Sequence, residues 1–496
     1  MAVANCRIKN NSNYGIDVTH YSYADIHNCT FVNNSNTNIR VYDHCWPEIS
    51  FCILDGNGTT NFGLQQNPYC VVGIRDSIFK NHTSCGISGS VGTLTVSNAI
   101  FENAQSRGIQ YSNSDLIIEH TLIADNSDEG LYADLGCSLT LTSSVIRRNG
   151  CDGVELHDNL VTTITNNWIH NNGVAHLIYY GGSGISFADQ SSVPLVRNNT
   201  IYDNWTYGLQ SSQYGADPNV RNCVIHDNNS GDLYRQNGSF NTVNYCCLQA
   251  PHTGTGNITG DPCFYQPENN DLHIRSESIC KNAGDPNGSY GNETDIDGEN
   301  RVYYGCVDAG GDEYYHPKAD YDINWIVNLL DYSRFADNWL DINSTISLDV
   351  DNDVDVYDLA LFCEDWLWEA PWEQGWMLRM GGEGFGEEMF MSESFFASDE
   401  ARPTGDQLMI PDAMQSLAAM PQRIAKKAQK FYSVNAFNNI HTRQQQAQAD
   451  IQIKQLSIEE LLEWLDGLWQ SGDLSEVMTY EKYLEFREAI QKAAEQ

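Results

Sequence analysis

A repeat of about 23 residues fills the first half of the chain and constrains its fold more than any other feature. Each copy has an apolar residue, an asparagine two positions later, a second apolar residue, a polar pair, and then a glycine followed by an apolar residue. Residues 26–34 read IHNCTFVNN, and residues 220–228 read VRNCVIHDN. Successive copies begin 22 to 25 residues apart, except for one step of 32, at Val3, Ile26, Ile49, Ile74, Val96, Ile118, Leu141, Ile164, Val196, Val220 and Val243.

This pattern predicts short strands with one buried face, because apolar and polar residues alternate within each copy. Asparagine and glycine provide the positive-φ turns between such strands. The period is too short for a propeller blade, and no helical period is present, so helical solenoids are excluded. Coils of short strands stacked on one another bury a continuous core, and their asparagines can bond between coils. We therefore predict a mainly β solenoid of about eleven coils over residues 1–250. Cys6, Cys29 and Cys52, each 23 residues from the next, are expected to stack as small buried side chains.

The repeats resemble those of bacterial secreted right-handed parallel β-helix proteins, known as PbH1 repeats. Four segments after the repeats are similar to the C-terminal cap of that group, at residues 260–264, 282–286, 295–301 and 307–314. The resemblance implies a right-handed parallel β-helix with a cap at residues 251–316 that covers the open edges of the last coil. No similar cap precedes Val3, which predicts either a missing N-terminal part or homo-assembly through the open first coil.

Residues 320–340 and 347–367 form an internal duplication with an offset of 27. Calcium takes six to eight oxygen ligands, mostly carboxylates and carbonyls, from alternating positions of a loop. The duplication therefore predicts two Ca²⁺ loops, with ligands drawn from Asp320, Asp322, Asn324, Asn328, Asp331, Asp349, Asp351, Asp355 and Asp358. The alternative is an acidic surface pair of helices without a metal.

Residues 317–370 resemble a dockerin, which is a pair of calcium loop–helix units. Trp325 and Asn352 stand at the sixth loop position, where glycine is usual, and Ser347 replaces the first carboxylate of the second loop. Residues 329–330 and 356–357 are not the hydroxyl residues that a cohesin reads, which argues against a cohesin-type partner. Calcium binding of this kind implies a location outside the cytoplasm.

Residues 371–412 read as a linker rich in Gly, Met, Glu and Ser. Residues 413–496 form a predicted helical region, in which residues 457–460 (SIEE) make a capping box before an amphipathic face at residues 461–468. This region is expected to dock on another chain or on the calcium module. It is either a terminal helical cap or a targeting or anchoring element.

Alignment of the coils after their turn glycine predicts a candidate catalytic group on one outward stripe. The alignment places Asp134 beside His157 and Tyr132 beside Glu155, because equivalent residues of adjacent coils lie about 4.8 Å apart. A histidine oriented by a carboxylate next to a second acid and a phenol can perform acid–base chemistry on a sugar. The longest step inserts residues 174–182, a loop that could wall one side of a groove. The alternative is that these are ordinary surface residues, since every solenoid exposes polar side chains.

Composition excludes some classes of function but does not identify one. The net charge of −39 leaves nothing to neutralise phosphates, so nucleic acid is excluded as a partner. No run of eighteen apolar residues is present, so no transmembrane segment is predicted. The start of this chain lacks the pattern of a signal peptide.

Two hypotheses about function remain. In the first, this is an extracellular or cell-surface protein that binds polysaccharide or assembles into surface or matrix structures. In the second, it is a secreted polysaccharide-degrading hydrolase or lyase. Resemblance supports the enzyme, because dockerin-type modules often accompany carbohydrate-active enzymes. It also argues against a lyase, because lyases of this group use Lys or Arg as base and the stripe holds only Arg40.

Overall fold

The computed structural model describes residues 1–365 with gaps. The gaps are residues 159–160, 175–180, 189–192, 213–215, 292, 304, 322–325, 328, 339–345, 349–353, 355–357, 360 and 363–364. The predicted linker at residues 371–412 and the predicted helical region at residues 413–496 therefore lie outside the described residues.

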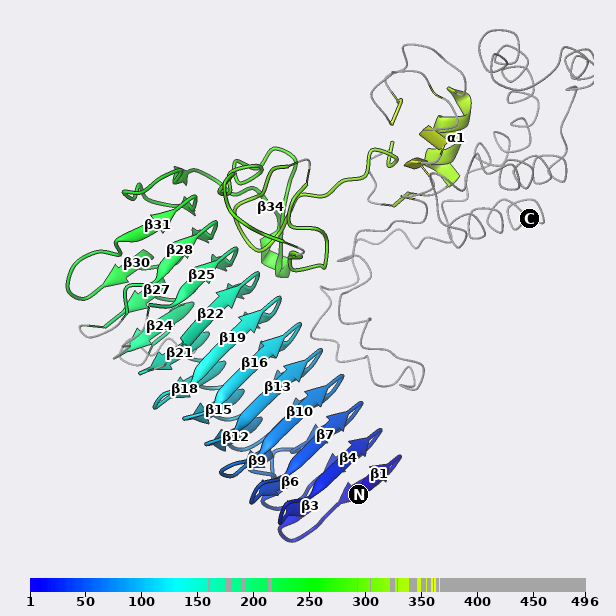
Figure 1. Cartoon of the computed structure of the whole chain (residues 1–496), viewed down its shortest axis with the longest axis vertical. Coiled ribbons are helices and arrows are strands. Elements are labelled where there is room, and N and C mark those ends of the chain that lie inside the picture. Colours follow the sequence, from blue (N-terminus) through cyan, green and yellow to red (C-terminus); the bar gives the residue numbers. More distant parts are fainter. Residues whose placement is uncertain are drawn as a thin grey trace, which may run out of the picture. The chain divides into compact units, whose positions relative to one another are not determined.

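Residues 1–259 form a parallel β-helix in which three long sheets run along the stack of coils (Figure 1). The first sheet has eleven strands: β1 (Ala2–Ala4), β4 (Tyr23–His27), β7 (Trp46–Ser50), β10 (Val71–Arg75), β13 (Thr93–Ser97), β16 (Asp115–Glu119), β19 (Ser138–Thr142), β22 (Val161–Thr165), β25 (Leu195–Arg197), β28 (Asn219–Arg221) and β31 (Thr242–Asn244).

The second sheet has twelve strands: β2 (Arg7–Lys9), β5 (Thr30–Val32), β8 (Ile53–Asp55), β11 (Ile78–Lys80), β14 (Ile100–Glu102), β17 (Leu122–Ala124), β20 (Val145–Arg147), β23 (Trp168–His170), β26 (Thr200–Tyr202), β29 (Val224–His226), β32 (Cys247–Leu248) and β33 (Ile258–Thr259). The third sheet has ten: β3 (Tyr14–Thr19), β6 (Thr37–Tyr42), β9 (Phe62–Gln66), β12 (Ile87–Ser90), β15 (Ile109–Ser112), β18 (Leu131–Asp134), β21 (Val154–His157), β24 (Ile185–Ala188), β27 (Tyr207–Ser211) and β30 (Gly231–Arg235).

The predicted repeat is confirmed, because each of its eleven opening residues lies in a strand of the first sheet. Neighbouring coils pair in the register that the repeat gives, so that Val3 pairs with Ile26 and Ile26 with Ile49. The inward residues of all three sheets, such as Ile26, Phe31 and Ile39, form one continuous buried core. The outward side chains of the same strands are therefore the candidates for a functional site.

Buried asparagines bond from coil to coil, as the sequence predicts. Nδ2 of Asn126 donates to Oδ1 of Asn149 at 3.0 Å, and Nδ2 of Asn149 donates to Oδ1 of Asn172 at 3.0 Å. The series continues through Asn204 to Asn228 at 3.0 and 2.9 Å. Each side-chain oxygen also accepts a backbone N–H of the preceding coil, so the ladder satisfies turn groups inside the core.

The expected cysteine stack forms in part. Cys29 and Cys52 are buried in adjacent coils, whereas Cys6 at the first coil is exposed, which corrects the expectation that all three are buried. The fourteen cysteines among the described residues are all free thiols. The stack is therefore a packing feature.

The segment after the β-helix packs chiefly on an outward face of the coils. β33 extends the second sheet beyond β32. β34 (Phe264–Gln266), the 3₁₀ helix η1 (Pro267–Asn269) and β35 (Asp271–Ile274) then form an antiparallel hairpin. Phe264, Leu272 and Ile274 bury apolar surface against Val145 and Trp168, which are outward residues of the second sheet. Because these contacts cover part of the second sheet, we look for the functional site on the third sheet.

A second compact unit begins at His316. It contains α1 (Leu329–Asp337), and its described part shows the sequence duplication as a repeated packing arrangement. Phe335 and Phe362, which are equivalent by the offset of 27, pack with ring centroids 5.2 Å apart. Among the described residues, no helix has both the length and the apolar character needed to cross a membrane.

Candidate functional site

The third sheet brings the predicted residues together. β18 and β21 pair in parallel with Tyr132 directly opposite Glu155, as the alignment of coils predicts. Alternation along the strand turns Tyr132, Asp134, Glu155 and His157 to the outward side, while Leu131 and its neighbours fill the core.

Glu155 and His157 form a hydrogen-bonded pair within β21. Nε2 of His157 lies 2.8 Å from Oε1 of Glu155, and the two side chains are 31% and 21% exposed. The ring of Tyr132 lies 5.4 Å from that of His157, centroid to centroid. The pair therefore presents a proton-exchanging group to solvent beside an aromatic ring.

The structure gives His157 a carboxylate partner that the sequence alignment did not predict. The alignment predicts Asp134 as the orienting acid, and the structure shows a hydrogen bond from His157 to Glu155 of its own strand. The charge of Asp134 also affects the pKa of Tyr132. Burial first, and then the charges of Asp134 and Glu155, raise the pKa of the Tyr132 phenol to about 12. At neutral pH Tyr132 is thus a hydrogen-bond donor and remains protonated.

Arg107 and Glu129 extend the site toward the preceding coils. Nε of Arg107 donates to Oε2 of Glu129 at 2.5 Å, and its guanidinium carbon lies 4.1 Å from the centroid of the Tyr132 ring. Burial raises the pKa of Glu129 to about 8, and the charge of Glu155 adds to the rise, while Arg107 opposes it. Glu129 therefore retains a proton over much of the neutral range.

Asp152 completes the acidic group on the next coil. Its Oδ1 accepts hydrogen bonds from the backbone N–H groups of Gly182 and Ser183, both at 2.6 Å. The side chain is buried, and burial together with the charge of Glu155 raises the pKa of Asp152 to about 7. Asp152 also fixes the end of the 174–182 insertion, of which residues 175–180 lie outside the described residues.

Sequence reasoning missed Arg107, Glu129 and Asp152, although a signal for them existed. Each directly precedes the turn glycine of its coil, at Gly108, Gly130 and Gly153. The residues immediately before the glycines form a stacked row of their own, beside the rows that follow them. Alignment of that row would have placed one arginine and two acidic residues on adjacent coils.

Three of the predicted calcium ligands lie among the described residues, and all three are buried. Oδ1 of Asp331 accepts the backbone N–H of Tyr321 at 2.7 Å, and Oδ1 of Asp358 accepts that of Leu348 at 2.5 Å. The two contacts are equivalent by the offset of 27. Asp320 forms an ion pair with a neighbouring histidine at 3.1 Å. The remaining six predicted ligands, Asp322, Asn324, Asn328, Asp349, Asp351 and Asp355, lie outside the described residues.

Two other groups of side chains have metal-ligand chemistry among the described residues. One ligand atom from each of Asp128, Glu129 and Cys151 lies within 4.8 Å of the others, and the same holds for His273, Asp297 and Asp312. In the second group, burial alone would lower the pKa of His273, but the charges of Asp297 and then Asp271 raise it well above its ordinary value. His273 is thus held as a cation between carboxylates.

Comparison with known proteins supports the fold. A family model described as "Right handed beta helix region" matches residues 67–191 and 176–272. The part of the chain that forms the three sheets is a right-handed parallel β-helix, as the resemblance implied. No curated protein sequence matches it.

Two solved structures are similar to this chain at low identity. Pectate lyase Pel9A is 14% identical, with 59% of this chain and 88% of that chain covered and a TM-score of 0.30. The periplasmic alginate epimerase AlgG is 11% identical, with 51% and 73% covered and a TM-score of 0.28. At these values neither likeness bears on function.

Proposed function

We propose that this chain is an extracellular or cell-surface β-helical protein that binds polysaccharide on the third sheet, around Tyr132, Glu155 and His157. The observation that carries the proposal is the partly exposed Glu155–His157 pair beside the ring of Tyr132 and the guanidinium of Arg107. A sugar offers an apolar ring face and a rim of hydroxyls. An aromatic ring next to several convergent polar groups complements both.

The test is retention of the purified chain in gels that contain different polysaccharides, with calcium present. Tyr132→Ala and Glu155→Gln/His157→Gln are expected to weaken retention by at least about tenfold, which corresponds to roughly 1.4 kcal/mol. Ile117→Ala is a matched control, because Ile117 is a 43% exposed residue of the first sheet. Retention that is equal in the wild type and both site variants, or absent in the wild type, contradicts the proposal.

Acid–base cleavage of a glycosidic bond is a second candidate function, and the raised pKa values of Glu129 and Asp152 favour it. Two acids that hold protons near neutral pH lie around a carboxylate–histidine pair that can accept one. Sites that separate the pKa values of their acids in this way can supply both a general acid and a general base. Glu155→Gln is expected to abolish the release of new reducing ends while leaving retention in the gel measurable. Release that persists in this variant contradicts the assignment.

The C-terminal unit is proposed to be a dockerin-like module that calcium stabilises. Asp331 and Asp358 fit this role, because each is a buried carboxylate at the equivalent place of a duplicated loop. Oxygen ligands of this type suit Ca²⁺, and the ion would tie each loop to its helix. Calorimetric titration with Ca²⁺ should show heat that Asp331→Asn/Asp358→Asn reduces. An unchanged titration contradicts the proposal.

A further inference from the structure

Five aromatic side chains gather on the first three coils, at the corner between the third and first sheets. They are Tyr21, Tyr23, His44, Trp46 and Tyr69, and we name them the aromatic surface. Four of them are strongly exposed: Tyr21 by 66%, Tyr69 by 62%, Tyr23 by 56% and Trp46 by 43%. Exposed rings of this size are uncommon in such density unless they serve an interaction.

The repeat itself creates this surface. His44 lies between Tyr21 and Tyr69 in a stack, with centroid distances of 4.8 and 5.0 Å and interplanar angles of 11° and 17°. On the adjoining strands, Tyr23 of β4 pairs directly with Trp46 of β7. The two rows are one residue apart in the chain, because Ser22 separates Tyr21 from Tyr23 and Cys45 separates His44 from Trp46.

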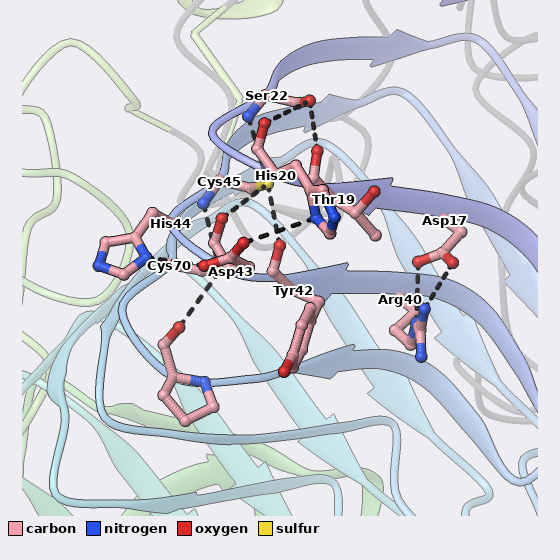
Figure 2. A network of polar contacts seen from close by, with 11 residues as sticks. Asp17, Thr19, His20, Ser22, Arg40, Tyr42, Asp43, His44, Cys45 and Cys70 are labelled. Atoms are coloured by element: carbon pink, nitrogen blue, oxygen red, sulfur yellow. Dashed lines mark hydrogen bonds and ion pairs between the residues drawn. The ribbon is translucent and has the colours of Figure 1, made fainter.

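Polar groups border the aromatic surface, and they are already paired. Figure 2 shows Asp43 between His20 and His44, at 3.5 and 3.0 Å, and Arg40 paired with Asp17. Nε and Nη2 of Arg40 donate to the two carboxylate oxygens of Asp17 at 2.8 and 2.6 Å. The arginine beside the surface is therefore engaged in a bidentate pair and is not displayed toward a ligand.

We propose that the aromatic surface is a second binding subsite, for an uncharged polysaccharide. This inference rests on the proposed function and specifies the class of polysaccharide. Rings bordered by hydrogen-bonding groups match the apolar faces and hydroxyl rims of neutral pyranose units. A polyuronate would meet carboxylates and an already paired arginine, on a chain of net charge −39. Charge therefore selects the neutral polymer.

The experiment compares retention in gels containing mixed-linkage β-glucan, galactomannan, polygalacturonate or alginate. The wild type is expected to bind a neutral polymer and to ignore the two anionic ones. Tyr21→Ala/Tyr69→Ala and Trp46→Ala should each weaken retention by at least about tenfold, because exposed tyrosine and tryptophan dominate such contacts. Val161→Ala, which removes an exposed side chain of the first sheet (61% exposed), should bind as the wild type does. Unchanged melting temperatures would show that all of these variants fold.

The outcomes separate this inference from the proposed function. Loss of binding in the aromatic variants on a neutral polymer supports the inference. If the wild type binds no polysaccharide, the proposed function fails and the inference fails with it. If Glu155→Gln/His157→Gln loses binding while the aromatic variants retain it, the inference alone fails. Preference for an anionic polymer overturns it, as does sedimentation showing self-association that Trp46→Ala abolishes without any effect on retention.

Discussion

Arg107 donates a 2.5 Å hydrogen bond from its Nε to Glu129, and the pair joins two adjacent coils directly beneath Tyr132. The carboxylate of Glu129 is largely buried, so its removal from water is offset chiefly by this one guanidinium. Arg107→Met should therefore lower the free energy of unfolding by about 3 kcal/mol, measured by chemical denaturation at pH 9, where Glu129 is ionised.

A double-mutant cycle tests whether the unpaired charge of Glu129 causes this loss. Arg107→Met/Glu129→Gln should recover most of the loss, because no uncompensated charge is left in the double variant. If the two single changes simply add, Arg107 stabilises the chain through packing on the Tyr132 ring and the ion pair is of minor importance.

Asp152 should make the stability of the β-helix depend on pH. Its folded pKa of about 7 lies above the ordinary value of 3.8, so its contribution to stability is fully present below about pH 4 and is lost as pH rises through 7. Asp152→Asn keeps the acceptor for Gly182 and Ser183 but has no charge to bury. Melting temperatures across pH 4–8 should fall less steeply for this variant than for the wild type. Parallel curves would show that Asp152 is not the titrating group.

The asparagine ladder should be far more sensitive to substitution than the surface. Asn149→Ala removes the acceptor shared by Nδ2 and the backbone N–H of Asn126, and the donor to the carbonyl of Ile123, which should cost about 2–4 kcal/mol of unfolding free energy. Asn61 donates a similar bond of 3.3 Å to Asn36 from an exposed position. Asn61→Ala is expected to cost below about 1 kcal/mol, and equal losses at both positions would contradict the role of burial.

Reducing agent should leave the β-helix intact. The fourteen described cysteines are free, and burial raises the pKa of the Cys52 thiol to about 12, so it stays protonated and unreactive. The melting temperature of freshly purified protein is expected to be the same with and without dithiothreitol. A fall on reduction would reveal a disulfide.

The fold was predictable because the repeat sets both strand and register. Once Val3 and Ile26 are aligned, side-chain alternation fixes which residues of every coil face outward, and Tyr132 opposite Glu155 follows. The hydrogen bond between His157 and Glu155 did not follow, because side-chain rotation, which alignment does not give, decides whether a residue bonds to a neighbour along its own strand. The pKa values of Glu129 and Asp152 depend on burial by surrounding coils, which alignment alone does not measure.

The regular spacing of the coils sets the distance between sites along the β-helix. Tyr69 follows β9 and Glu155 lies in β21, four strands further along the third sheet. At about 4.8 Å for each step, this places the two surfaces roughly 19 Å apart along the stack. Insertion of one whole coil between them would lengthen that separation by about 4.8 Å without altering either surface. The number of repeats therefore sets the distance between the two proposed points of attachment on one polymer.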